Sequence, residues 1–430
     1  MIYSDPWRLI TSVLIFILSI VELVAVEPNS LNEGFEMKTS EWLWWRGPAR
    51  NGEADANQKP PTRWSEDTNI VWKAKIAGRG YGSPIVVGEK VILQTADEVT
   101  DSQSVLCFER GSGKLIWNSI IHKSGGMRKN KKSTAASSTP ACDGERVFVN
   151  YANSDAVVAT ALDLMGNTIW QQEVSKYVIH QGYGSSPALY QSLVIVSADS
   201  KGGGAIAAMD RKSGKIVWRR DRPEKPNYSS PVILHVAGRD QLVITGCDQI
   251  ISYDPLTGAT IWESEGATTE CVTSTVTDGN RIFTSGGYPK NHVSAVRADG
   301  SGKVDWENQD RLYVPSLVCR EGYLYAVLDA GIAVCWKSET GEEMWKSRLG
   351  GTFSSSPVLV GDKIYATSES GETFIFRADS TKHEELGKNL LGDEVLSTPV
   401  FVSNQIFYRA SELIEGQRQE FLYCIGRLSE

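Results

Sequence analysis

Short apolar runs separated by tight turns fill the chain from residue 68 onwards. Residues 85–93 contain two apolar segments joined at Gly88-Glu89, and residues 358–366 repeat that arrangement around Gly361-Asp362. Short apolar runs joined by Gly-containing turns are typical of β-hairpins. No segment beyond residue 26 keeps the apolar period of a helix. The pattern therefore predicts an all-β protein.

A turn followed by a strand that ends in Trp recurs along this region. Residues 210–218 read Asp-Arg-Lys-Ser-Gly-Lys-Ile-Val-Trp, and residues 254–262 read Asp-Pro-Leu-Thr-Gly-Ala-Thr-Ile-Trp. Seven tryptophans end such strands: Trp72, Trp117, Trp170, Trp218, Trp262, Trp306 and Trp345. They recur about every 45 residues, the length of a four-stranded propeller blade. Because one indole buries on the order of 200 Å², we expect these side chains to pack between adjacent blades.

A second marker, Ser or Thr followed by Pro and an apolar strand, has the same period. Six copies are complete: Ser83-Pro84, Thr139-Pro140, Ser186-Pro187, Ser230-Pro231, Ser356-Pro357 and Thr398-Pro399. Two degenerate copies complete the series: Ser274-Thr275 and Pro315-Ser316. Eight anchors predict an eight-bladed β-propeller of four-stranded antiparallel blades.

The two ends of the repeat region complement each other. The last repeat, from Thr398 onwards, has no Trp-terminated strand, whereas residues 69–73 form a Trp-terminated strand without a blade. Pairing the N-terminal strand into the last blade closes the ring and removes an open sheet edge. We therefore expect the propeller to cover residues 68–430, preceded by an extension over residues 27–67 that packs on it.

The repeats resemble a known family. The Asp-x-x-Thr-Gly-x-x-x-Trp units with Ser-Ser-Pro-Val anchors are similar to the pyrroloquinoline-quinone (PQQ)-like β-propeller repeat, a WD40-like, BamB-like architecture. Residues 42–52, Trp-Leu-Trp-Trp-Arg-Gly-Pro-Ala-Arg-Asn-Gly, resemble the Trp-Arg-Gly-Pro opening of secreted propellers of planctomycete type. The resemblance implies the fold but does not imply that the cofactor is bound.

The resemblance leaves three functions open. The first is a non-catalytic scaffold that binds envelope proteins, as BamB-type propellers do. The second is a PQQ/Ca²⁺-dependent quinoprotein dehydrogenase, which would typically carry an adjacent Cys-Cys pair; here no two cysteines are adjacent. The third is a small-ligand or glycan-binding propeller that uses the mouth of the axial channel. We favour the scaffold, expect no cofactor or metal, and leave enzymatic activity open.

Segments that lead into the innermost strands line one mouth of a propeller channel, so they hold the candidate ligand site. The candidates are Arg79, Tyr81, His180, Tyr183, Tyr228, Glu270, Arg311 and Tyr313. Tyrosines that precede the anchors would place phenols around the axis, where they suit carbohydrate, quinone or peptide recognition. Alternatively, the phenols only plug the channel by packing on one another. His180 is either a general base or a structural residue.

Composition restricts the partners and the compartment. With 44 Lys and Arg against 52 Asp and Glu, the net charge is −8, which disfavours nucleic acid. The apolar run at residues 9–21 spans about 20 Å as a helix, short of the ~30 Å hydrocarbon core. Residues 1–26 therefore predict a signal peptide, with an uncleaved anchor through residues 9–26 as the alternative. Either predicts an exported, periplasmic or envelope-associated monomer.

A basic run and the seven cysteines each leave two interpretations open. The basic run at residues 128–132 is either a solvated loop or a docking patch for an acidic partner. The seven cysteines lie mostly in apolar runs, so we expect buried free thiols, with one or two disulfides as the alternative in an oxidising compartment.

Overall fold

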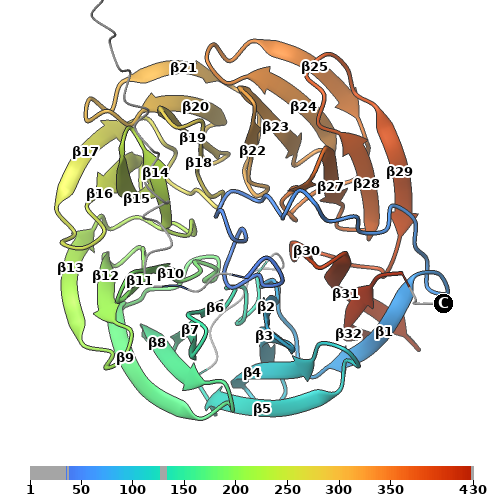
Figure 1. Cartoon of the computed structure of the whole chain (residues 1–430). Coiled ribbons are helices and arrows are strands. Elements are labelled where there is room, and N and C mark those ends of the chain that lie inside the picture. Colours follow the sequence, from blue (N-terminus) through green and yellow to red (C-terminus); the bar gives the residue numbers. More distant parts are fainter. Residues whose placement is uncertain (1–34, 36–37, 126–132, 428–430) are drawn as a thin grey trace, which may run out of the picture.

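A computed structural model describes residue 35, residues 38–125 and residues 133–427 of the chain. Eight four-stranded antiparallel sheets are arranged around a central axis (Figure 1). The described residues contain no helix, and hence none that could span a membrane. The predicted all-β, eight-bladed propeller is confirmed. The predicted signal peptide or anchor at residues 1–26 lies outside the described residues, and so does the basic run at residues 128–132.

The first four blades follow the chain from the innermost to the outermost strand. Blade 1 comprises β2 (Ile85–Val87), β3 (Lys90–Asp97), β4 (Ser102–Glu109) and β5 (Leu115–His122). Blade 2 comprises β6 (Ala141–Cys142), β7 (Arg146–Asn153), β8 (Ala156–Asp163) and β9 (Thr168–Lys176). Blade 3 comprises β10 (Ala188–Tyr190), β11 (Leu193–Ser197), β12 (Gly204–Asp210) and β13 (Ile216–Arg222). Blade 4 comprises β14 (Val232–Val236), β15 (Arg239–Gly246), β16 (Gln249–Tyr253) and β17 (Thr260–Glu265).

The next three blades repeat this order and the eighth combines both chain ends. Blade 5 comprises β18 (Val276–Thr277), β19 (Arg281–Gly286), β20 (His292–Arg297) and β21 (Val304–Asn308). Blade 6 comprises β22 (Val318–Arg320), β23 (Tyr323–Leu328), β24 (Ile332–Lys337) and β25 (Glu343–Arg348). Blade 7 comprises β26 (Val358–Val360), β27 (Lys363–Thr367), β28 (Glu372–Arg377) and β29 (Glu385–Leu390). Blade 8 comprises β30 (Val400–Val402), β31 (Gln405–Ile414), β32 (Gln417–Ile425) and β1 (Ile70–Ile76).

The ring closes where the sequence predicts. Strand β1 pairs antiparallel with β32, with Trp72 opposite Cys424 and Ala74 opposite Leu422. The backbone N–H of Gly426 also donates to the carbonyl of Asn69 at 2.9 Å. The N-terminal strand is thus the outermost strand of blade 8, and no blade is left with an incomplete sheet.

Six of the eight contacts between consecutive blades pair a tryptophan with a glycine, from the contact of blade 8 with blade 1 to that of blade 5 with blade 6. Trp170, on outer strand β9, donates Nε1–H to the carbonyl of Arg211 in blade 3 at 3.0 Å. Its ring lies against Gly214, which has a φ of +73°. Trp218 repeats the contact with Pro255 and Gly258 of blade 4. The Trp-ended strand and the Gly turn are therefore two halves of one contact between consecutive blades.

Six of the seven tryptophans donate to the following blade. The acceptors are the backbone carbonyls of Arg110, Leu164, Arg211, Pro255, Ser338 and Asp379, for Trp72, Trp117, Trp170, Trp218, Trp306 and Trp345. Trp262 differs, because its Nε1–H donates to Gln241 Oε1 of its own blade at 2.7 Å. Its ring still lies against Gly302 of blade 5.

The segment before β1 crosses the centre of the ring (Figure 1) and pairs with the inner edges of innermost strands. Trp42 forms a β-bridge with Val86 of β2, and Glu53 forms one with Leu359 of β26. Two buried arginines fix the crossing. The Arg46 guanidinium donates to the carbonyls of Pro357 and Leu317, and Arg50 donates to that of Leu189. Burial lowers the pKa of Arg46 to about 9 and that of Arg50 to about 10.

All seven cysteines are buried and unpaired. Burial raises the pKa of each thiol, for example to about 11 in Cys271 and about 12 in Cys107. The thiols therefore act as small apolar side chains of the core.

Candidate functional site: the axial pocket

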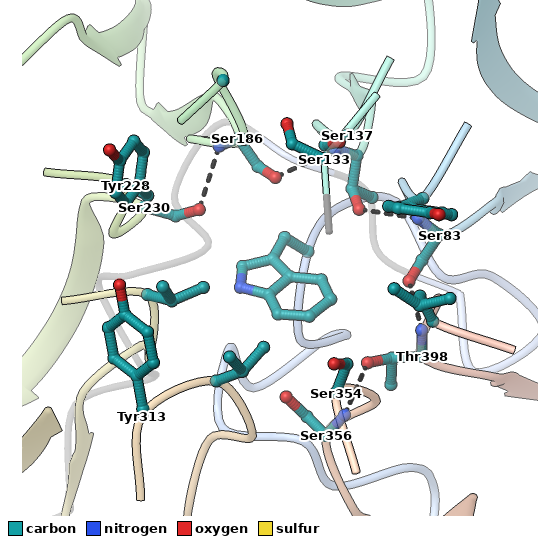
Figure 2. A pocket seen from close by; sticks show the side chains of 18 of the residues that line it. Ser83, Ser133, Ser137, Ser186, Tyr228, Ser230, Tyr313, Ser354, Ser356 and Thr398 are labelled. Atoms are coloured by element: carbon teal, nitrogen blue, oxygen red, sulfur yellow. Dashed lines mark hydrogen bonds between the residues drawn. The ribbon is translucent and has the colours of Figure 1, made fainter. Parts of the chain in front are cut away.

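The Ser and Thr anchors form a ring of hydrogen bonds around the axis. In each link, a backbone N–H of one anchor donates to the side-chain hydroxyl of the next, as the dashed lines in Figure 2 show. Seven links have lengths of 2.9–3.1 Å: Ser83 to Thr139, Thr139 to Ser186, Ser186 to Ser230, Ser274 to Ser316, Ser316 to Ser356, Ser356 to Thr398, and Thr398 to Ser83. The link from Thr398 to Ser83 closes the circle between the last and the first blade.

The eighth position of this ring, between Ser230 and Ser274, is occupied differently. The indole Nε1–H of Trp45 donates to Ser274 Oγ at 2.8 Å. Trp45 belongs to the segment that crosses the ring, so its indole reaches the level of the hydroxyls from one end of the channel. Trp45 also lines the pocket that the anchor hydroxyls line. The channel is therefore a cup with an indole at its floor.

The cup has a volume of about 390 Å³, within the range of small-molecule sites. Its mouth opens on the face where the innermost strands begin, which we call the mouth face. This face also carries the connections between blades and the turns between the second and third strands of each blade. Four tyrosines from different blade connections line the wall: Tyr81, Tyr183, Tyr228 and Tyr313.

The hydroxyls of Tyr183 and Tyr313 are hydrogen-bonded into the wall, whereas the buried Tyr228 hydroxyl has no partner in the described part of the chain. Tyr183 Oη donates to the carbonyl of Ser197 at 2.8 Å and accepts from Asn150. Tyr313 Oη donates to Glu270 Oε2 at 3.0 Å. Burial raises the pKa of Tyr313 well above its ordinary value, and the Glu270 carboxylate adds to this effect. The raised pKa values keep these phenols protonated at neutral pH.

The hydroxyl groups that face the cup come from the anchor ring instead. Each ring oxygen accepts a backbone N–H, yet no group in the described part of the chain accepts its O–H proton in a hydrogen bond. This holds for the six ring members that line the pocket: Ser83, Thr139, Ser186, Ser230, Ser356 and Thr398. The floor of the cup is thus encircled by hydroxyl donors.

The structure brings the eight candidate residues to one region of the mouth face. Five line the pocket: Tyr81, Tyr183, Tyr228, Arg311 and Tyr313. The other three support them from behind: Arg79 donates to the Tyr81 hydroxyl, while Glu270, which is buried, contacts both Tyr313 and His180. His180 Nε2 lies 3.2 Å from Glu270 Oε1. A ligand-binding role for these residues stays a prediction.

Sequence reasoning missed three parts of the cup. Trp45 lies in the predicted N-terminal extension, and its Trp-Trp-Arg-Gly-Pro run was the available signal. The anchor Ser and Thr residues were assigned as markers of strand starts, and their shared hydroxyl chemistry was the available signal. Asp329, which lines the pocket and accepts the N–H of Tyr313 at 2.7 Å, had no signal in the repeat pattern.

Comparison with known proteins decides the family. The family model described as "Outer membrane protein assembly factor BamB" matches residues 101–347 and 289–382. The chain belongs to this PQQ-like propeller family. The tetrathionate hydrolase of Acidithiobacillus ferrooxidans is 22% identical over 359 residues, which cover 70% of this chain. The match covers 65% of the hydrolase, so this chain spans less than two thirds of that relative's length.

Solved structures share the fold of this chain. A europium-containing methanol dehydrogenase aligns with a TM-score of 0.67 at 11% identity, over 92% of this chain and 100% of that one. BamB from Moraxella catarrhalis aligns with a TM-score of 0.58 at 15% identity, over 82% and 98%. The quinohemoprotein alcohol dehydrogenase of Comamonas testosteroni aligns with a TM-score of 0.64 at 12% identity, over 91% and 82%. At these identities the likeness shows the fold alone.

Pyrroloquinoline quinone and calcium, the cofactors of the dehydrogenase alternative that the repeat resemblance left open, do not fit the cup. Pyrroloquinoline quinone is a tricarboxylate, whereas Arg311 is the one Lys or Arg side chain among the described residues that line the pocket. Calcium takes six to eight oxygen ligands in proteins. Within residues 38–125 and 133–427, no group of three His, Cys, Asp or Glu side chains could hold a metal ion. The residues of this cup thus suit a ligand with less negative charge.

Proposed function

We propose that this family member is an exported, non-catalytic propeller that binds partner proteins in the cell envelope. Membership of a family described as an outer membrane assembly factor supports this function. The observation that carries it is a group of exposed aliphatic side chains on the mouth face, beside the cup. We call Val99, Leu413 and Ile414 the aliphatic tips, because each lies at the end of a hairpin.

The aliphatic tips lie on neighbouring blades. Val99 lies in the turn between β3 and β4 of blade 1 and is 95% exposed. Leu413 and Ile414, 64% and 47% exposed, end strand β31 of blade 8. Strands β31 and β32 have 10 and 9 residues, and β31 is the longest strand that the structure describes. Apolar side chains at the ends of long hairpins gain free energy when a partner covers them.

The surroundings of the tips favour a polypeptide partner. Lys73 forms an ion pair with Glu412 at 2.7 Å beside Leu413, and Arg418 pairs with Glu394 at 2.6 Å on the neighbouring strand and loop. Apolar groups at the centre with charged groups around them are typical of protein interfaces that form and dissociate. We propose that envelope proteins bind here and that the propeller itself is a monomer.

Photocrosslinking from two faces tests this function. A benzophenone amino acid at Leu413 reports on the mouth face. The same amino acid at Met165, 73% exposed in the turn between β8 and β9, reports on the opposite face as a matched control. In native cells, we expect a discrete envelope protein to crosslink at position 413 and not at 165. The same protein must be recovered reciprocally when it carries the tag.

A second variant tests the apolar contact itself. Leu413→Ser with Ile414→Ser should reduce recovery of that protein at least fivefold, whereas Met165→Ser should leave recovery unchanged. Equal crosslinking from both faces, or full recovery with the serine variant, would refute the proposed docking surface. Fractionation of the same cells and N-terminal sequencing of the mature protein test export and cleavage of residues 1–26.

A further inference from the structure

We infer that the axial cup binds a neutral sugar unit, such as the terminal residue of a glycan. This site is distinct from the aliphatic tips and does not depend on the proposed protein partner. Three features of the cup support the inference: its aromatic surfaces, its hydroxyl donors and its low charge.

The aromatic surfaces suit the C–H face of a sugar ring. The cup has the Trp45 indole at its floor and the rings of Tyr81, Tyr183, Tyr228 and Tyr313 along its wall. Figure 2 shows Tyr228 and Tyr313 along one side of the pocket, across from Ser354, Ser356 and Thr398. Aromatic rings carry a negative face that attracts C–H groups bearing partial positive charge. A sugar that enters the cup can therefore stack on a ring while its hydroxyls turn to the opposite wall.

The hydroxyl donors match the polar groups of a sugar. A hydroxyl group has one donor and two acceptor positions, and the six ring hydroxyls that line the cup have used one acceptor position each. Because their O–H protons have no acceptor in the described part of the chain, they favour a ligand that is rich in oxygen acceptors. A hydrocarbon ligand would leave these protons unpaired in a confined space, which costs free energy.

The charge of the cup excludes strongly ionic ligands. Among the described residues that line it, the acidic and basic side chains are Arg311 and Asp329. Arg311 is exposed at the rim, lies over the Tyr313 ring at 5.4 Å from its centroid and donates to the carbonyl of Gly287 at 3.0 Å. One cation and one anion balance, so a polyphosphate or polycarboxylate would lack counter-charges. A neutral, oxygen-rich ligand with C–H faces is a saccharide.

The cup is also closed at the end opposite its mouth, so only the end of a glycan chain can enter it. The segment with Arg46 and Arg50 lies across that end, and the Trp45 indole fills the level of the anchor ring. A polysaccharide could not thread through the ring. We therefore expect recognition of a terminal sugar, with the rest of the glycan leaving over the mouth face.

An immobilised array of neutral and acidic glycans provides the probe, with affinities measured by calorimetry for the glycan that binds best. We expect neutral glycans that share one terminal sugar to bind. Trp45→Phe should weaken binding at least fivefold, and so should Arg311→Gln at the exposed rim. Trp64→Phe is the matched control: Trp64 is buried in the same N-terminal segment but does not line the cup, so the affinity should be unchanged.

An unchanged melting temperature of Arg311→Gln keeps the comparison valid even if Trp45→Phe disturbs the segment. Binding to no glycan, or equal affinity of Arg311→Gln and wild type, would overturn the inference. Preferential binding of polyanionic glycans would also overturn it. The crosslinking at Leu413 reports on the partner protein separately, so failure of one proposal does not imply failure of the other.

Discussion

Replacement of the glycine that lies under an inter-blade tryptophan tests how the blades are held together. Gly214 has a φ of +73°, and a Cβ at this position would lie 2.6 Å from the Trp170 ring. Gly214→Ala therefore introduces two costs. A left-handed conformation costs a non-Gly residue about 1–2 kcal/mol. Overpacking against a buried side chain costs about 1–3 kcal/mol more.

We expect Gly214→Ala to lower the free energy of unfolding by about 2–5 kcal/mol, the sum of those two costs. Two other glycines in turns between the third and fourth strands separate the contributions. Gly300 has a φ of +105° but nothing within 4 Å of a Cβ, so Gly300→Ala should show the conformational cost alone. Gly111 has no positive φ and open space around it, so Gly111→Ala should be nearly neutral.

Equilibrium urea unfolding of the three variants, with midpoints compared at a common slope, measures these differences. The expected order of stability is Gly111→Ala, then Gly300→Ala, then Gly214→Ala. If Gly214→Ala unfolds within about 0.5 kcal/mol of Gly300→Ala, the tryptophan does not pack against the glycine as described. If all three are equal to wild type, the glycines have no role in joining the blades.

Three more measurements test the ring and the core. Ser83→Ala removes the acceptor for the N–H of Thr398, so it should lower the free energy of unfolding in urea by about 1–3 kcal/mol. The control Ser112→Ala, in an exposed turn, should leave it unchanged; equal effects of the two variants would contradict a structural role for the anchor ring. Asp199→Ala leaves the buried Arg222 without its 2.9 Å partner and should lower the free energy of unfolding by about 3–5 kcal/mol. The control Asp221→Ala, at an exposed position, should change it little; a similarly small effect of Asp199→Ala would show that water reaches the ion pair. The pKa of each of the seven thiols is raised by burial, so thiols of the unfolded chain ionise first. The free energy of unfolding should therefore fall above about pH 9, by up to about 1.4 kcal/mol per pH unit for each thiol; a urea midpoint that does not decline by pH 10.5 would contradict the burial of these groups.

The architecture was predictable because it repeats. Each blade contributes its own Ser or Thr anchor and most contribute a Trp, so the period survives even where single copies such as Ser274-Thr275 are degenerate. The pairing of β1 with β32 followed from two incomplete repeats at opposite ends of the sequence. Regular spacing thus fixed both the number of blades and the closure.

The cup was less predictable, because its parts depend on geometry rather than on period. Trp45 occurs in a single-copy segment, and nothing in its sequence neighbours says that its indole meets Ser274. The tyrosines were found by their place before the anchors, but the direction of each hydroxyl depends on a local partner such as Ser197 or Glu270. Likewise, the anchor hydroxyls become a ring only when eight blades bring residues from distant parts of the sequence together.

The central claim is a closed ring, and a disulfide across its closure tests that claim most directly. Lys75 of β1 lies opposite Phe421 of β32. Directly opposed residues of an antiparallel pair have Cα atoms about 4.5–5.5 Å apart, within the range of disulfides. With Lys75→Cys and Phe421→Cys, mild oxidation should give an intramolecular disulfide, detected as faster migration on a non-reducing gel and by mass spectrometry of the linked peptides. A control pair, Lys75→Cys with Lys346→Cys on blade 6, should not form one. Failure of the first pair to link within one chain, or equal linking by the control pair, would contradict a ring closed by its two ends.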